Sequence, residues 1–267
     1  MKTIIIFGPT SSGKTKLAFE VAKHLNNNVE AISADSRQVY KSCQIGTGSI
    51  DNKIFEEFGI KLHLTEFLEP NEDYSVSMWQ KSAYELVERI KCQGKVCIII
   101  GGTGLYIDSL LYNREYGNDL QPFCKDNILF LTPDIERNQV YENINNRVEE
   151  MFEMGFVDEV RHLINLFDSS TLEGVKQNLF DNKRDRRGLP AILQGAGYKQ
   201  ILEYLDTQEI LNSGRKVEIV PRFRQKYILD LETCKEKVKV SYRNYAKRQY
   251  TWFRKYFEEF EVEKIKI

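Results

Sequence analysis

The stretch Gly8-Pro9-Thr10-Ser11-Ser12-Gly13-Lys14-Thr15 decides the fold of this 267-residue chain. It fits the pattern G-x-x-x-x-G-K-[ST], follows an apolar run at residues 4–7, and precedes apolar residues at helical spacing over residues 17–25. In that context the glycine-rich backbone surrounds a diphosphate, Lys14 supplies a positive charge, and the Thr15 hydroxyl can hold Mg²⁺. The sequence therefore predicts an α/β fold with a P-loop NTPase-like parallel sheet flanked by helices.

The composition is that of an ordinary globular protein, with 42% hydrophobic residues available for a core. The N-terminal apolar run is too short for a signal peptide or a membrane span, so we expect a cytoplasmic protein with no membrane partner. The five cysteines form no C-x-x-C pair and the three histidines are scattered. This pattern indicates neither a zinc site nor a disulfide framework.

The net charge of −1 conceals a basic C-terminal segment, because residues 214–256 carry thirteen Lys and Arg against four Asp and Glu. We expect residues 223–256 to form a long helix in which cations alternate with aromatic residues, the composition of an RNA-binding face. Its cations are Lys235, Lys237, Lys239, Arg243, Lys247, Arg248, Arg254 and Lys255. A polyanionic partner is therefore expected at this end of the chain.

Asp35 is a second candidate site residue, because it follows the short apolar strand predicted at residues 29–33. The carboxyl ends of neighbouring parallel strands face one crevice, so Asp35 is expected near the phosphate loop, where a general base would be useful. The spacing leaves open the alternative that Asp35 only caps a turn or the start of a helix.

The buried strand predicted at residues 95–100 runs into Gly101-Gly102-Thr103-Gly104 rather than into an acid. A P-loop enzyme that hydrolyses nucleotides usually has a carboxylate at this point, which organises Mg²⁺ and water. The sequence thus predicts diphosphate binding without the usual hydrolytic partner.

The other elements follow from periodicity and capping residues. We expect a loop at residues 45–48, helices at 75–93 and 105–111, a strand at 127–131, a long helix from 132–134 to 152, a helix at 156–167 and a short helix ending at Leu205. Arg147 lies off the apolar stripe of the long helix and could face the crevice. The charged run at residues 183–187 could contact nucleic acid or be solvated surface.

Five motifs in this chain resemble those of the bacterial-type tRNA dimethylallyltransferases (isopentenyl-diphosphate:tRNA transferases). They are residues 8–15, residues 32–40 with 45–47, residues 101–106, residues 197–199 and residues 246–254. The resemblance implies transfer of a dimethylallyl group from dimethylallyl diphosphate to the N6 amine of the adenosine on the 3′ side of the anticodon in tRNA. Diphosphate is the leaving group, and the acceptor base is flipped out to reach the donor.

The resemblance also implies roles for individual residues. Asp35 would accept the amine proton, Thr103 would bond the diphosphate, and Lys14 with Mg²⁺ on Thr15 would neutralise charge as the allylic C–O bond breaks. The diphosphate would be bound by Gly8, Pro9, Thr10, Ser11, Ser12, Gly13, Lys14, Thr15 and Arg147. The tRNA would be contacted by Asp35, Ser36, Arg37, Gln38, Thr103, Gln194, Gly195, Ala196, Gly197, Tyr198, Lys199, Lys247, Arg248, Gln249, Tyr250, Thr251, Trp252, Phe253 and Arg254.

The largest departure from the family pattern concerns a helical insertion of several dozen residues that normally follows the motif at residues 101–106. Here only about residues 112–126 occupy that interval. We therefore expect a P-loop core at residues 1–213 and a basic helical segment at residues 214–267, which completes the core and contacts the anticodon stem-loop. Smaller departures are Gly195-Ala196 in place of Ala-Ile, Tyr242 in place of Thr, and Asn244 in place of Gln. The chain is expected to act as a monomer.

Two other functions stay open at this point. A P-loop kinase or nucleotide-binding ATPase would explain the phosphate loop but leaves residues 35–38 and the basic aromatic segment without a role. An RNA-binding family member with reduced or lost catalysis would keep both features.

Overall fold

A six-stranded, all-parallel sheet forms the centre of the computed structural model, which describes residues 2–49, 52–112, 120–174, 190–212 and 230–267. The strand order is β3-β2-β4-β1-β5-β6. The strands are β1 (Thr3–Phe7), β2 (Val29–Ser33), β3 (Lys61–His63), β4 (Val96–Gly101), β5 (Ile128–Pro133) and β6 (Val262–Ile265). The predicted α/β fold with a parallel sheet is therefore confirmed.

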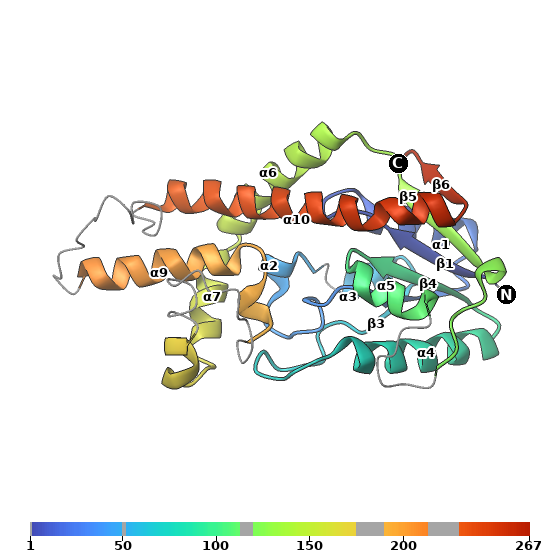
Figure 1. Ribbon diagram of the computed structural model, residues 1–267, viewed down its shortest axis with the longest axis horizontal. Helices are drawn as coiled ribbons and strands as arrows, with labels where there is room; N and C mark the ends of the chain where they lie inside the picture. Colours follow the sequence, from blue (N-terminus) through green and yellow to red (C-terminus); the bar gives the residue numbers. More distant parts are fainter. Residues whose placement is uncertain (1, 50–51, 113–119, 175–189, 213–229) are drawn as a thin grey trace.

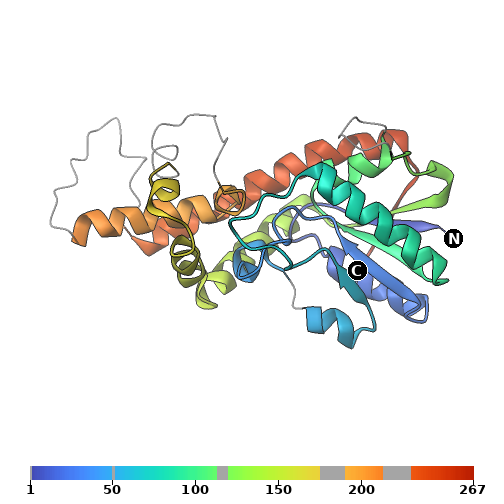
Figure 2. The same ribbon diagram turned by 90° about the horizontal axis from the view of Figure 1, so that it is seen from below.

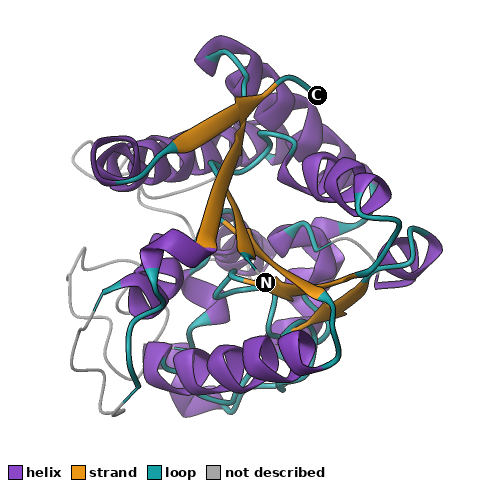
Figure 3. Cartoon of the chain, turned by 90° about the vertical axis from the view of Figure 1, so that its right-hand side faces the viewer, coloured by secondary structure: helices purple, strands orange, loops and turns teal. Residues whose placement is uncertain are grey.

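Helices cover both faces of this sheet (Figure 3). The α-helices are α1 (Lys14–His24), α2 (Gln44–Thr47), α3 (Asn52–Glu57), α4 (Val76–Cys92), α5 (Gly104–Leu111), α6 (Arg137–Glu153), α7 (Phe156–Ile164), α9 (Tyr198–Asn212) and α10 (Leu231–Glu259). Short 3₁₀ helices lie at Lys125–Asn127 and Ile192–Gln194. None of the described helices is long and apolar enough to cross a membrane.

Side-chain alternation along β1 divides the sheet core into two layers. Ile5 and Phe7 pack in one cluster with residues of α4, α5 and α10. Ile4 and Ile6 pack in another with residues of α1 and α3. Because both faces are covered, every residue of β1 and β2 is buried, which explains the apolar run at residues 4–7 of β1.

A third core cluster joins α6, α7, α9 and the first half of α10 at the end of the molecule away from the sheet. Figures 1 and 2 show this helical part at one end and the sheet at the other, with α10 running along both. The 29 residues of α10 therefore contribute to the helical core through Val238 and Tyr242 and to the sheet core through Phe253 and Tyr256.

Several element boundaries differ from the predictions. The strand β5 continues through Pro133 because β6, which was not predicted, pairs with it, and α6 consequently begins at Arg137 rather than at 132–134. The expected loop at residues 45–48 contains the short helix α2, α9 extends beyond Leu205 to Asn212, and α7 ends at Ile164 rather than at residue 167. The last helix begins at Leu231, not at residue 223, with the Asp230 side chain accepting a hydrogen bond from Thr233 N at 2.7 Å.

Other boundaries were predicted well. The strand β2 has the expected limits, and the Ser75 hydroxyl caps α4 by accepting a hydrogen bond from Met78 N at 3.2 Å. The charged run at residues 183–187, residues 113–119 of the shortened interval, and residues 213–229 lie outside the described part of the chain.

Candidate active site

A cavity of about 730 Å³ is lined by residues that follow β1, β2 and β4 and by residues of α2, α6 and α10. The carboxyl ends of adjacent parallel strands meet here, as predicted from the position of Asp35. The predicted site residues that line it are Thr10, Ser11, Ser12, Gly13, Lys14, Thr15, Asp35, Ser36, Arg37, Gln38, Arg147, Gln194, Gly195, Ala196, Tyr198, Arg248 and Gln249. The cavity lining does not include Gly8, Pro9, Thr103, Gly197, Lys199, Lys247, Tyr250, Thr251, Trp252, Phe253 or Arg254.

The phosphate loop passes from β1 into α1 with a backbone that turns inward. Gly13 has φ +92°, a backbone conformation that favours glycine. The Ser11 and Ser12 hydroxyls are buried and have no hydrogen-bond partner among the described residues. Buried hydroxyls are rarely left unpaired, and these two belong to a loop whose chemistry suits phosphate oxygens.

Lys14 is half-buried and lines the cavity, and its Nζ donates a hydrogen bond to Pro9 O at 2.7 Å. Burial lowers the pKa of Lys14 to about 8, Asp35 opposes that change, and Arg147 adds to it. An anion in the cavity would favour the charged form of this ammonium group.

Arg147 extends from α6 to the phosphate loop and faces the crevice. Its Nη1 donates to Thr10 Oγ1 at 3.1 Å, and its Nη2 donates to Thr47 O at 3.5 Å. A Cβ on Gly48, which has φ +57°, would lie 1.0 Å from Arg147 Nη2. The guanidinium therefore occupies the space that a side chain at position 48 would need.

Asp35 both lines the cavity and caps a turn, so its position agrees with both interpretations, a carboxylate in the crevice and a turn cap. Its Oδ1 accepts a hydrogen bond from Arg37 N at 2.9 Å. Thr103 fixes the same turn from the glycine-rich segment after β4, because its hydroxyl oxygen accepts from Ser36 N at 3.0 Å.

Gln249 of α10 joins the phosphate loop to that glycine-rich segment. Its Oε1 accepts from Thr10 N at 2.8 Å, and its Nε2 donates to Gly102 O at 2.9 Å. Gln249 is buried, and both ends of its amide are used within the protein. These bonds link the two loops of the site, and a contact of Gln249 with tRNA stays a prediction.

Two other residues expected to contact tRNA are also buried. The Phe253 ring packs in the sheet core, 5.1 Å from the ring of Phe7. Tyr198 is buried in the helical core, and its hydroxyl donates to Glu159 Oε1 at 2.9 Å. Both side chains therefore pack in the cores of the protein.

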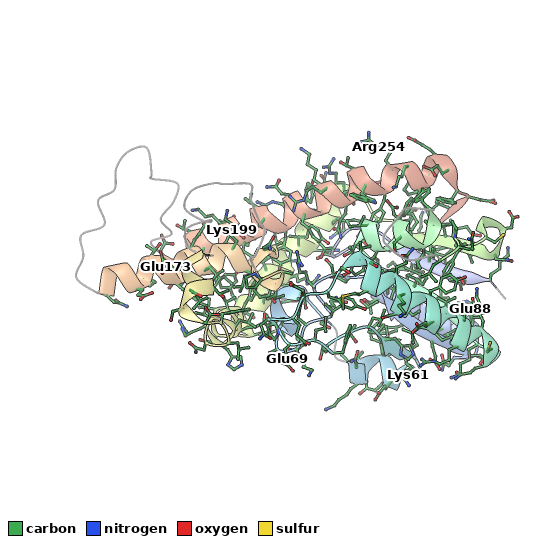
Figure 4. All side chains as sticks on the ribbon, turned by 60° about the horizontal axis from the view of Figure 1, so that its bottom comes forward. Lys61, Glu69, Glu88, Glu173, Lys199 and Arg254 are labelled. Atoms are coloured by element: carbon green, nitrogen blue, oxygen red, sulfur yellow. The ribbon has the colours of Figure 1, made fainter. Side chains whose placement is uncertain are left out.

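Six of the eight cations of the predicted RNA-binding face fall into two groups, one paired with carboxylates and one exposed. Lys235 and Lys239 pair with Glu149 of α6, and Lys255 pairs with the buried Asp108 of α5 at 2.5 Å. Lys247, Arg248 and Arg254 are exposed, and Figure 4 shows Arg254 extending outward from α10. Thr251 and Trp252 are exposed beside them, and Trp252 Nε1 donates to Asp108 Oδ2 at 3.1 Å.

The turn before α9 carries the other predicted tRNA residues. Gly197 has φ +87°, and a Cβ there would lie 2.8 Å from the ring of Phe156 and 3.0 Å from the ring of Tyr242. Lys199 is partly exposed, with its Nζ 3.9 Å from Glu203 Oε1 (Figure 4). Tyr250 is half-buried, and its hydroxyl has no hydrogen-bond partner in the part of the chain that the structure describes.

Some lining residues were not predicted. Asn143 Nδ2 donates to Ser11 O at 3.2 Å, and because it lies four residues before Arg147 it shares a helix face with that residue. Helical spacing from Arg147 could have identified it. Tyr242 and Tyr245 also line the cavity, and burial raises the pKa of both phenols. The sequence predicted no site role for either tyrosine: Tyr242 stood out only as a departure from the family pattern, and Tyr245 only as one of the aromatic residues of the helix.

Comparison with known proteins agrees with the resemblance. The "IPP transferase" family model matches residues 38–126 and 113–256, and the "Isopentenyl transferase" model matches residues 1–61. The tRNA dimethylallyltransferase of Acetivibrio thermocellus is 31% identical over 319 residues, covering 94% of this chain and 88% of the relative.

Solved structures show the same similarity. The full-length tRNA isopentenylpyrophosphate transferase from Bacillus halodurans superimposes with a TM-score of 0.71 at 26% identity, covering 99% of this chain and 89% of that one. The tRNA delta(2)-isopentenylpyrophosphate transferase from Staphylococcus epidermidis gives a TM-score of 0.68 at 26% identity, covering 100% and 93%. This chain therefore belongs to the tRNA dimethylallyltransferase, or IPP transferase, family.

Proposed function

We propose that this chain takes a dimethylallyl group from dimethylallyl diphosphate and attaches it to the N6 amine of the adenosine 3′-adjacent to the anticodon in tRNA. Its relatives are named tRNA dimethylallyltransferases, and the chain is an enzyme of the same kind. The observation that carries the finer proposal is that the phosphate loop, Arg147 and Asp35 line one cavity. A cationic diphosphate site and a carboxylate base are what the transfer needs.

The proposed reaction forms one bond and breaks one. The amine nitrogen attacks the first carbon of the dimethylallyl group, and the electron pair of the C–O bond leaves with the diphosphate. Asp35 accepts the proton that the amine loses. Lys14, Arg147 and the N–H groups at the start of α1 stabilise the negative charge of the departing diphosphate.

Mg²⁺ is the proposed cofactor, with Thr15 as its protein ligand. The Thr15 hydroxyl lines the cavity beside the loop, and the described residues contain no cluster of three His, Cys, Asp or Glu side chains that would hold a metal by themselves. This donor set fits Mg²⁺, which commonly takes one or two protein oxygens together with phosphate oxygens. When bound, the ion would add positive charge at the leaving group.

Nucleotide hydrolysis is the weaker alternative. β4 ends at Gly101, and a Cβ there would lie 2.2 Å from Ala34 O, so the backbone of the Asp35 segment occupies the space of any side chain at this position. No acid can therefore replace Gly101 without moving this segment.

The proposed tRNA surface comprises Lys247, Arg248 and Arg254 of α10 with Lys199 of α9, whose exposed charges suit phosphates. We also propose that the family insertion is shortened at residues 112–126. Two observations support this: the alignment to the first relative extends over 319 residues, more than this chain contains, and the two matches to the family model meet at residues 113–126. The proposed domain division remains a core at residues 1–213 and a C-terminal segment at 214–267.

A single chain supplies every residue of the proposed site, so the proposed active unit is a monomer, acting on tRNA in the cytoplasm.

The test is to incubate the protein with Mg²⁺, dimethylallyl diphosphate and unmodified tRNA, digest the RNA, and measure isopentenyladenosine by mass spectrometry. The control is the same tRNA with guanosine beside the anticodon. Product only with adenosine is expected. Absence of product together with phosphate release from ATP at an enzymatic rate would overturn the proposal in favour of a P-loop kinase or ATPase.

A further inference from the structure

The short helix α2 is bonded at its start by Glu159 of α7 and at its end by Arg147 of α6. Its own N-cap residue, Cys43, makes no side-chain capping bond. Instead, Glu159 of α7 supplies the acceptor from across the fold: its Oε2 accepts from Ile45 N at 2.7 Å and its Oε1 from Gly46 N at 3.0 Å. A carboxylate at the first N–H groups of a helix satisfies donors that the helix itself cannot.

The other end of α2 supports Arg147. Arg147 Nη2 donates to Thr47 O, and the guanidinium lies against the bare Cα of Gly48. The opposite Nη1 donates to Thr10 of the phosphate loop. A continuous set of contacts therefore runs from Glu159 through α2 to Arg147 and the loop.

Glu159 is held in a way that suits a positioning role. The Tyr198 hydroxyl donates to its Oε1, and Tyr242 donates to Gly46 O, so α2 is fixed by side chains from α7 and α10. Glu159 does not line the cavity, and no ion pair to it is recorded among the described residues. Burial raises the pKa of Glu159, while the N–H groups of Gly46 and Ile45 oppose that change. Its contacts are therefore to the α2 backbone and not to the substrate site.

We propose that Glu159 is a positioning residue for diphosphate binding: by holding the N-terminus of α2, it sets the Thr47 carbonyl and Gly48 where they direct Arg147 toward the phosphate loop. This inference rests on the proposed diphosphate role of Arg147. Glu159 would thus affect the binding of dimethylallyl diphosphate although its side chain lies outside the cavity.

The test compares four proteins: wild type, Glu159→Gln, Arg147→Ala and the double variant. Glu159→Gln keeps the shape but places an NH₂ group against one of the two backbone donors. We expect it to raise both the dissociation constant of Mg²⁺–pyrophosphate and the KM for dimethylallyl diphosphate about 5–20-fold, with the KM for tRNA unchanged. In the Arg147→Ala background the same substitution should add less than about twofold, because coupled residues give non-additive effects.

Glu149→Gln is the matched control, because Glu149 is also an intramolecularly bonded carboxylate but pairs with Lys235 and Lys239, away from α2. It should leave pyrophosphate binding unchanged. Glu159→Asp, which keeps the charge on a shorter side chain, should restore part of the loss.

Three results would overturn the inference. They are wild-type pyrophosphate binding in Glu159→Gln, a full additional loss in the double variant, and failure of both Glu159 variants to fold by circular dichroism, which would make Glu159 a residue of the fold alone. Unchanged pyrophosphate binding in Arg147→Ala would instead remove the role of Arg147 and this inference with it. Absence of prenyl transfer by the wild type would count against the proposed function, and the pyrophosphate measurements distinguish that case.

Discussion

Gln249 Oε1 accepts a hydrogen bond from the backbone N–H of Thr10 across 239 positions of sequence, at 2.8 Å. The same amide donates to Gly102 O, so one side chain of α10 spans two loops of the site. Gln249→Ala should therefore leave a buried N–H and a buried carbonyl without partners and lower the free energy of unfolding by about 1–3 kcal/mol. Urea denaturation measures the loss.

Binding should separate this role from tRNA recognition. Gln249→Ala is expected to weaken diphosphate binding while leaving tRNA affinity nearly unchanged, measured by calorimetry and filter binding. A variant that binds tRNA poorly but diphosphate normally would contradict the positioning role and restore the role first expected for Gln249.

Asp35→Asn tests the general base with little change of structure. An Asn oxygen can still accept the hydrogen bond from Arg37 N, so the turn is retained and only the basicity is lost. Prenyl transfer should fall by about 10²–10⁴-fold, with tRNA affinity within about twofold of wild type. Rates from single-turnover assays at saturating donor provide the measurement, and a loss smaller than tenfold would rule out Asp35 as the base.

Lys247→Ala combined with Arg248→Ala tests the proposed RNA surface. Removing two phosphate contacts should make the slope of log affinity against log salt concentration shallower by about 1.4–1.8. Lys235→Ala with Lys239→Ala is the control, because it removes the same charge from the same helix but from side chains that pair with Glu149. Equal changes of slope in both double variants would show that net charge, not this surface, governs binding.

The ionisation of Lys14 predicts a dependence of donor binding on pH. Burial lowers its pKa to about 8 from the usual 10.5, and diphosphate binds the charged form. Affinity for dimethylallyl diphosphate should therefore be full below pH 8 and fall as the pH rises through that value, by at most about tenfold per unit. Lys14→Arg, which stays charged, should give a flatter profile between pH 7 and pH 9.5. A wild-type affinity that rises with pH would contradict this account.

Much of the fold was readable from local patterns. The phosphate-loop motif, the apolar runs of β1 and β4, and the Ser75 cap all depend on short-range interactions, and each lies where expected. β6 was missed because its residues, Val262 to Ile265, are half exposed and form a strand only by pairing with β5. That pairing also moved the start of α6, which no local capping residue could reveal.

The candidate site was predictable to a similar degree. The position of Asp35 followed from its place at the end of a parallel strand. The position of Arg147 followed from its spacing relative to the apolar residues of its helix. The burial of Gln249 and Phe253 was not predicted, because a basic, aromatic helix has one face toward the core and one toward solvent, and composition does not say which residue lies on which face. Glu159 could not be found, because its partners are backbone groups more than a hundred residues away.

The position of α10 along the chain also sets the order in which the site can be assembled during synthesis. At about 5–20 residues per second, the ribosome needs roughly 12–48 s to proceed from Thr10 to Gln249. The glycine-rich segment after β4 is made during that interval, and from then until Gln249 is added both loops exist without the side chain that joins them. A nascent chain therefore lacks a complete diphosphate site until α10 has emerged and packed along the sheet.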